Sequence, residues 1–231
     1  MERRDFLKLC AVGAAGAAAP AIAADAQARF YSRSRLVDEK GAPLLASAVP
    51  VKRNLIFNYP YEATPCFLLN LGEPVKPAAK LATADHQSYE WKGGVGPGRS
   101  IVAYSAICAH KLTYPTREIS FISFRAEKGP ADRQASVIHC CSEHSQYDPS
   151  QGARVVAGPA PQPLAAILLE QHARSGELYA VGTLGGEMFG EFFAKYEFKL
   201  AMELGASSRR ASGPDCVVRP IENYCRQQVK C

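Results

Sequence analysis

Two short groups of cysteine and histidine are the residues of this sequence best suited to chemistry. The first is Cys-Ala-His at residues 108–110, and the second is Cys-Cys-Ser-Glu-His at residues 140–144. Each offers a thiolate and an imidazole, and each follows a run of residues that favours a β-strand. Two such loops side by side would supply two thiolates and two imidazoles. That ligand set fits a structural zinc ion or a 2Fe-2S cluster with thiolates on one iron and imidazoles on the other.

The residues that follow the second group favour the cluster over zinc. The chain continues Ser-Gln-Tyr-Asp-Pro at 145–149, and Gly-Pro-Ala-Pro follows at 158–161. This combination resembles the Rieske iron-sulfur family, whose pattern is C-x-H in one loop, C-x-x-H followed by Ser, Tyr and Asp in another, and a proline loop. The resemblance covers residues 50–185. It implies an all-β fold, a small antiparallel sandwich or barrel with the cluster-binding loops at one tip, and one 2Fe-2S cluster.

The resemblance implies four ligands to this cluster: Cys108, His110, Cys141 and His144. Cys141 is favoured because it keeps the C-x-x-H spacing to His144. Counting back from the Ser, Tyr and Asp of the family pattern instead selects Cys140, and this register places Glu143 in the imidazole position. Only one of the adjacent cysteines can be the ligand, so Cys140 stays as the alternative to Cys141.

Four further residues are implied to act around the cluster. By resemblance, Ser145 would donate a hydrogen bond to a bridging sulfide and Tyr147 would donate one to a ligand thiolate, which raises the potential. Pro159 and Pro161 would cover the cluster and limit the access of water. The alternative for the first two is a turn serine and a packed tyrosine.

The remaining cysteines have no assigned role. Family members often carry an extra cysteine in each cluster loop, joined as a disulfide, but no cysteine follows Cys108 in the first loop, so that bridge is expected to be absent. A disulfide between Cys225 and Cys231, or one that involves Cys216, is compatible with an oxidising compartment. The pairing of these residues and of Cys66 cannot be read from sequence.

The elements that would position the two loops are short strands. Runs of β-prone residues alternate with Gly, Pro and Asn turns, at 54–58, 66–69, 100–105, 119–124, 136–140, 153–156, 164–171 and 178–181. Strands at this spacing predict a small all-β sandwich or barrel.

One helix is expected after the last strand. Apolar residues recur with a period of 3.6 between residues 187 and 204, and Gly205 is a plausible C-cap. The predicted organisation is therefore a signal at 1–28, a lead-in at 29–50, the Rieske domain at 51–185, the helix at 186–205 and a cysteine-containing tail at 206–231. We expect the helix to pack on its own domain, with docking to a partner as the alternative.

The N-terminus resembles a twin-arginine export signal. Arg3 and Arg4 precede Phe-Leu-Lys, a weakly apolar run rich in Ala and Gly, and small residues suited to cleavage. The run is too short and too weakly apolar for a stable membrane span. We therefore expect a periplasmic protein, which associates with a membrane only if the signal is retained. Cargo of this route is usually folded around a cofactor before export.

Composition narrows the function further. The chain has 231 residues, eight of them cysteine, and a net charge of +5. One domain of this size excludes a Rieske-type oxygenase, which needs a second domain for its mononuclear iron, and the mild charge gives no argument for nucleic acid. We therefore expect an electron-transfer subunit of an oxidoreductase rather than a catalytic chain.

The partner depends on which relatives are compared. Residues 93–111 look most like the small subunit of arsenite oxidase, which implies a catalytic oxidoreductase subunit as donor and a c-type cytochrome or cupredoxin as acceptor. Residues 158–161 look more like the Rieske protein of cytochrome bc complexes, which implies quinol oxidation in a bc-type complex. A non-redox zinc-binding module is the third hypothesis.

Overall fold

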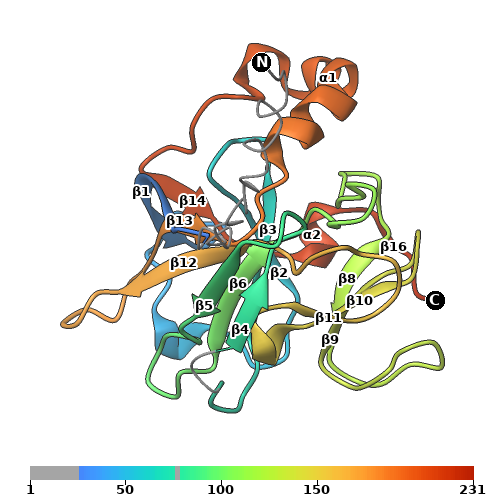
Figure 1. The fold of residues 1–231 in the computed structure, drawn as a ribbon. Helices are drawn as coiled ribbons and strands as arrows, with labels where there is room; N and C mark the ends of the chain where they lie inside the picture. The colour runs from blue at the N-terminus through green and yellow to red at the C-terminus, as the bar shows by residue number, and fades with distance from the viewer. Residues whose placement is uncertain (1–25, 76–78) are drawn as a thin grey trace, which may run out of the picture.

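The computed structural model describes residues 26–75 and 79–231, arranged as two main β-sheets with one long helix (Figure 1). Two further pairs of short strands and several short helical turns complete the described elements. The fold is all-β with a C-terminal helix, as the sequence predicts. The export signal is expected at residues 1–28, and residues 1–25 of it lie outside the described part of the chain.

The larger sheet has eight strands. Their order is β14 (Asp215–Val217), β1 (Arg29–Val37), β13 (Leu178–Leu184), β12 (Ala166–Gln171), β6 (Ile101–Ser105), β3 (Pro65–Asn70), β2 (Leu55–Asn58) and β15 (Arg219–Pro220). In this sheet β1 and β14 pair in parallel, and the other neighbours are antiparallel. The central strands β3 and β6 are buried almost throughout, because apolar side chains cover both of their faces.

The smaller sheet carries the second group of cysteine and histidine. Its order is β11 (Arg154–Ala157), β10 (Ser145–Asp148), β9 (Val137–Cys140) and β8 (Ile122–Arg125). Strands β9 and β10 form a hairpin in which Cys140 pairs with Ser145 and Ile138 pairs with Tyr147. The turn of this hairpin is therefore residues 141–144, and its register decides which side chains face the core.

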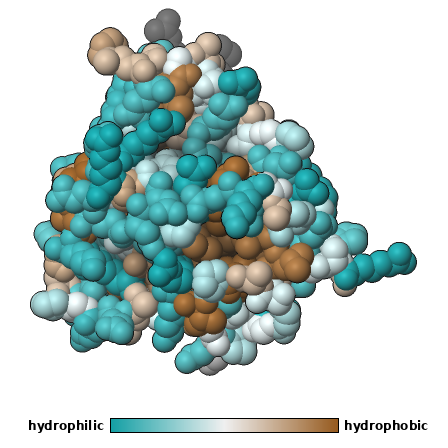
Figure 2. Space-filling model, turned by 180° about the vertical axis from the view of Figure 1, so that it is seen from behind, coloured by the Kyte–Doolittle hydropathy of each residue, from teal (hydrophilic) through white to brown (hydrophobic). Residues whose placement is uncertain are grey.

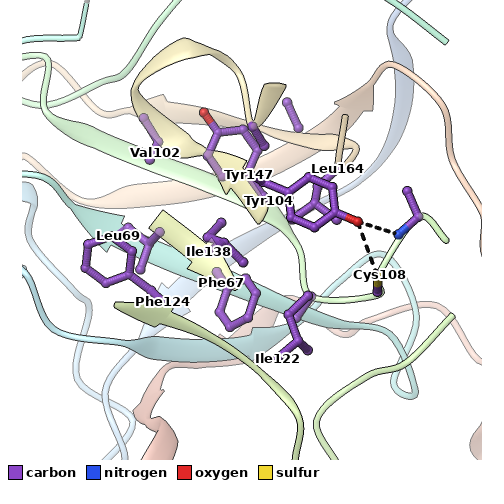
Figure 3. Packing of buried hydrophobic residues seen from close by; sticks show 14 of the residues in the cluster. Phe67, Leu69, Val102, Tyr104, Cys108, Ile122, Phe124, Ile138, Tyr147 and Leu164 are labelled. Atoms are coloured by element: carbon purple, nitrogen blue, oxygen red, sulfur yellow. Dashed lines mark hydrogen bonds between the residues drawn. The ribbon is translucent and has the colours of Figure 1, made fainter. Parts of the chain in front are cut away.

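The main hydrophobic core joins the two sheets. Phe67 and Tyr104 come from the larger sheet, and Ile138 and Tyr147 come from the smaller one (Figure 3). All four are inaccessible to solvent. Burying one side chain of this size stabilises a fold by roughly 2–3 kcal/mol, so this core holds the smaller sheet firmly against the larger.

The predicted helix is α1 (Phe189–Leu204), and it packs on its own domain. Gly205 ends it in a positive-φ conformation, with its N–H donating to the carbonyl of Ala201. Phe192 packs edge-on against Tyr114 at a centroid distance of 4.9 Å, and the same cluster includes Leu112. Helix α1 thus covers the chain that follows Cys108.

All eight predicted strands are present with bounds shifted by a few residues, and the run 119–124 is divided between β7 (Ile119–Ser120) and β8. Two strand pairs complete the fold, β7 with β16 (Gln227–Gln228) and β4 (Ala79–Ala82) with β5 (Ser88–Trp91).

The segments expected as a lead-in and a tail are part of the fold. Strand β1 lies within the large sheet, and β14, β15 and β16 pair with β1, β2 and β7. The helical turn α2 (Ile221–Tyr224) follows β15. These contacts form through backbone hydrogen bonds, which leave no apolar periodicity in the sequence to detect.

The surface is mostly hydrophilic. Seen from behind, hydrophobic side chains gather below the middle of the face, and the hydrophilic β12–β13 turn projects from the molecule (Figure 2). Phe198 and Met202 are exposed one turn apart on α1. None of the helices in the described part of the chain is long and apolar enough to cross a membrane.

A substitution at Gly152, just before β11, tests the packing behind the smaller sheet. Its φ is +70°, and an added Cβ would lie 2.6 Å from Leu81 Cδ1 and 3.2 Å from the Trp91 ring. We expect Gly152→Ala to lower the free energy of unfolding by about 2 kcal/mol, because it combines overpacking with an unfavourable backbone conformation. Urea denaturation measures the change.

Gly213→Ala is the matched control, because an added Cβ there would meet nothing within 4 Å. Equal stability losses in the two variants would contradict this account of the packing around Gly152.

Candidate metal centre

The two loops predicted to hold ligands lie next to one another. The first, residues 106–114, follows β6, and the second is the β9–β10 turn. In the first loop, the N–H of Leu112 donates to the carbonyl of Cys108 at 2.9 Å, and the N–H of Cys108 donates to the carbonyl of Thr113 at 2.8 Å. These two bonds close the loop, so that Cys108 lies in the core while Lys111 is exposed.

Cys140, and not Cys141, is the cysteine of the second loop that lies beside Cys108. Successive side chains of a strand point to opposite faces, and Ile138 and Cys140 both face the main core that contains Cys108. Cys141 lies beyond the end of β9 and forms a disulfide with Cys231. Its sulfur is therefore not available as a thiolate, in contrast to the expectation from C-x-x-H spacing. The alternation of apolar residues at 122, 124, 138 and 140 was the signal for this register.

The thiols of Cys108 and Cys140 interact directly. A hydrogen bond with Cys140 has the largest effect on Cys108, and with a further bond from Tyr147 it lowers the pKa of Cys108 to about 6, although burial opposes the change. Backbone N–H groups of His110 and Lys111 contribute to the same lowering. The pKa of Cys140 is raised, first by its bond to Cys108 and then by burial. Cys108 is therefore the more acidic thiol of the pair.

Two hydroxyl groups face the same space as these thiols. The Tyr147 hydroxyl lies 3.2 Å from Cys108 Sγ and accepts a hydrogen bond from the N–H of Ala109, also at 3.2 Å (Figure 3). Ser145 is the cross-strand partner of Cys140, so the two side chains share one face of the hairpin. The Ser145 hydroxyl is buried and makes no hydrogen bond among the described residues.

His110 directs a nitrogen atom toward the second loop. Its Nδ1 is buried and has no hydrogen-bond partner among the described residues. Glu143 Oε2 lies 3.9 Å from this nitrogen, and Lys111 Nζ lies 3.4 Å from the other carboxylate oxygen of Glu143. Buried polar atoms without partners are rare in folded proteins. Two thiols, His110 Nδ1 and the Ser145 hydroxyl therefore form a donor set suited to a metal-sulfur group.

His144 does not join these donors. Its φ is +58° and its side chain is exposed. The ring lies 5.9 Å from the ring of His139. Since His139 and Cys140 are consecutive in β9, their side chains occupy opposite faces of the strand. Of the two predicted imidazoles, His110 has a buried ring nitrogen without a partner among the described residues, whereas His144 is exposed.

The proline segment lies over the second loop. Gly158 has a φ of +84°, and a Cβ there would come within 2.5 Å of Ser145 Cα and also collide with the carbonyl of His144. Only glycine fits so close to the turn. Pro159 and Pro161 themselves are exposed, and Ala160 contacts the main core. The backbone of this segment therefore supports the turn.

The Cys141–Cys231 disulfide is the part of this region that sequence reasoning missed. Arg125 Nη2 lies 2.8 Å from Cys141 Sγ, and His139 Nε2 lies 3.4 Å from Cys231 Sγ. Asp132 Oδ1 lies 2.5 Å from His139 Nδ1, and both side chains are buried. Burial lowers the pKa of His139, although Asp132 opposes the change. These contacts hold the end of the chain against β8 and β9.

Three donor atoms of His139, Cys141 and Cys231 lie within 4.8 Å of one another. Because the two sulfurs are bonded to each other, this group is a disulfide site rather than a metal site.

The other cysteines differ from the pairing considered from sequence. Cys231 pairs with Cys141 and not with Cys225 or Cys216, and both of these are free and buried, as is Cys66. The two partners are 90 residues apart. Only the three-dimensional path of the tail, through its pairing with β1, β2 and β7, brings them together.

The sequence matches no protein-family model. Among solved structures, the chain is similar to the crystal structure of the soluble domain of the Rieske protein II (soxF) from Sulfolobus acidocaldarius. The two share 24% sequence identity with a TM-score of 0.46, and the alignment covers 68% of this chain and 82% of the other.

Removing the disulfide tests its structural role. We expect the double variant Cys141→Ser/Cys231→Ser to lose about 4 kcal/mol of unfolding free energy, because the bond closes a loop of 90 residues. Urea denaturation under oxidising conditions measures this loss.

A thiol reductant provides the control for this experiment. It should lower the stability of the natural protein to that of the double variant and leave the variant unchanged. A natural protein whose stability does not respond to reduction would contradict the prediction.

Proposed function

We propose that this chain is a Rieske-type electron-transfer protein that binds one 2Fe-2S cluster. The observation that carries the proposal is that two buried thiols, Cys108 and Cys140, share one core cluster in front of the loop of His110, whose buried Nδ1 has no hydrogen-bond partner among the described residues. Cys108 and Cys140 would hold one iron, and His110 would bind the other together with a residue of the β9–β10 turn. When bound, such a cluster carries one electron at a time.

The surroundings of the thiols support a cluster over a single zinc ion. A structural zinc ion is satisfied by four ligands, whereas sulfide ions accept additional hydrogen bonds. Ser145 offers a buried hydroxyl with no partner among the described residues, and Tyr147 offers one at Cys108 Sγ. Hydrogen bonds to sulfur stabilise the reduced state and raise the potential.

The chain's own residues would exclude water from the metal-bound thiolates and leave the imidazole of His110 partly exposed to solvent. Cys108 and Cys140 are fully buried, while the His110 side chain remains 24% exposed. An imidazole at the surface is a short route for an electron to a docked partner. This arrangement supports a relay rather than a catalytic site.

The proposal also covers the cellular location of this electron-transfer protein and its redox partners. The N-terminal resemblance to a twin-arginine signal supports export to the periplasm. The resemblance of residues 93–111 to the arsenite oxidase small subunit supports a catalytic oxidoreductase as electron donor and a c-type cytochrome or cupredoxin as acceptor. Co-purification of the exported protein with such a subunit would test this assignment.

Reconstitution with iron and sulfide tests the cofactor and the ligand register together. We expect the natural protein to bind two irons and two acid-labile sulfides, and Cys108→Ser and Cys140→Ser to lose the cluster. Cys141→Ser should keep it, because that sulfur belongs to the disulfide. Iron and sulfide analysis with EPR of the reduced protein makes the measurement.

Two results would count against this scheme. Binding of one zinc ion without sulfide would exclude the cluster. Cluster loss in Cys141→Ser, with retention in Cys140→Ser, would return the ligand to Cys141.

Tyr147→Phe tests the hydrogen bond to the thiolate. We expect the midpoint potential to fall by roughly 50 mV, which corresponds to about 1 kcal/mol of preference for the reduced state in a one-electron reaction. Tyr104→Phe is the matched control, because its hydroxyl is buried but donates to the carbonyl of Pro149 at 2.7 Å. Protein-film voltammetry measures both variants, and equal shifts would contradict a specific role for Tyr147.

A further inference from the structure

The geometry points to Glu143 as the fourth ligand, so that a carboxylate replaces one of the two imidazoles expected from the sequence. We propose a donor set of two thiolates, one imidazole and one carboxylate, supplied by Cys108, Cys140, His110 and Glu143. The inference rests on the proposed function, because it names the remaining ligand of that cluster.

The register of the β9–β10 hairpin is the first argument. Because Cys140 pairs with Ser145, the four residues between them form the turn. Glu143 is the third residue after Cys140, on the side of the turn that approaches the first loop. In the resembled family pattern, counted back from Ser145, this is the position of the second imidazole.

The direction of the Glu143 side chain is the second argument. One carboxylate oxygen lies 3.9 Å from the buried Nδ1 of His110, and the other lies 3.4 Å from Lys111 Nζ. His110 Nδ1 makes no hydrogen bond among the described residues, so no protein group competes with a metal for this nitrogen. Carboxylate oxygen and imidazole nitrogen are both common ligands to iron.

The placement of His144 is the third argument. Its ring packs edge-on against His139, on the face of the hairpin away from Cys140. A Cβ on Gly158 would collide with the His144 carbonyl, so Gly158 closely covers the backbone of the turn. This close fit of Gly158 against the backbone opposes a change in the conformation of the turn at His144.

A carboxylate in place of an imidazole changes the charge of the cluster with its ligands. Two ferric ions and two sulfides carry +2, so two thiolates and two imidazoles give a neutral oxidised centre. With one carboxylate in place of an imidazole the oxidised centre is −1, and adding an electron becomes less favourable. Lys111 lies beside this carboxylate and partly compensates its charge.

Pulsed EPR of the reduced, reconstituted protein counts the imidazole nitrogens coupled to the cluster. We expect one imidazole in the natural protein, none in His110→Ala variants that retain iron, and an unchanged spectrum in His144→Ala. Glu143→His should gain a second imidazole coupling and shift the midpoint potential upward. Glu143→Gln should lose iron more readily on gel filtration than His144→Ala, which is its matched control.

The outcomes separate this inference from the proposed function. A cluster with two imidazole couplings, one of which disappears in His144→Ala, overturns the role of Glu143 and leaves the electron-transfer proposal intact. A natural protein that binds no acid-labile sulfide overturns both. Circular dichroism of each variant confirms that the hairpin is folded.

Discussion

The pairing of Cys140 with Ser145 across β9 and β10 is the constraint on which the candidate site depends. This single register turns Cys140, Ser145 and Tyr147 toward the core and sends His139 to the other face. A shift by one residue would exchange the two faces and bury an imidazole where a thiol now lies. The large core shared with the eight-stranded sheet opposes such a shift, because Ile138 and Tyr147 are inaccessible to solvent.

Two other parts of the chain stabilise the loops from outside. Helix α1 packs Phe192 against Tyr114 and thereby covers the end of the first loop. The tail runs along three strands before Cys231 bonds to Cys141 at the start of the second turn. The covalent support of the second turn therefore comes from the C-terminal tail.

Sequence reasoning succeeded where side chains leave a pattern. The predicted strands and the helix are present because apolar spacing reflects burial, and the first loop was placed correctly after β6. Pairing through the backbone leaves no such pattern, so the sequence predicts only a lead-in where β1 lies and a tail where β14 lies. The C-x-x-H spacing that favours Cys141 describes a motif, whereas strand alternation decides which way a thiol faces, and it turns Cys140 toward the core. A disulfide partner 90 residues away carries no local signal.

The disulfide also constrains the two loops of the site unequally. It closes a covalent ring of residues 141–231, which contains the second turn, the strands from β10 onward and α1. The first loop precedes this ring and is held only by noncovalent packing and backbone hydrogen bonds. In an oxidising compartment, local opening is therefore less costly for the loop of Cys108 and His110 than for the turn. The amides of that loop should therefore exchange hydrogen faster than those of β9 and β10, and in the proposed cluster protein this loop would open first when metal enters or leaves.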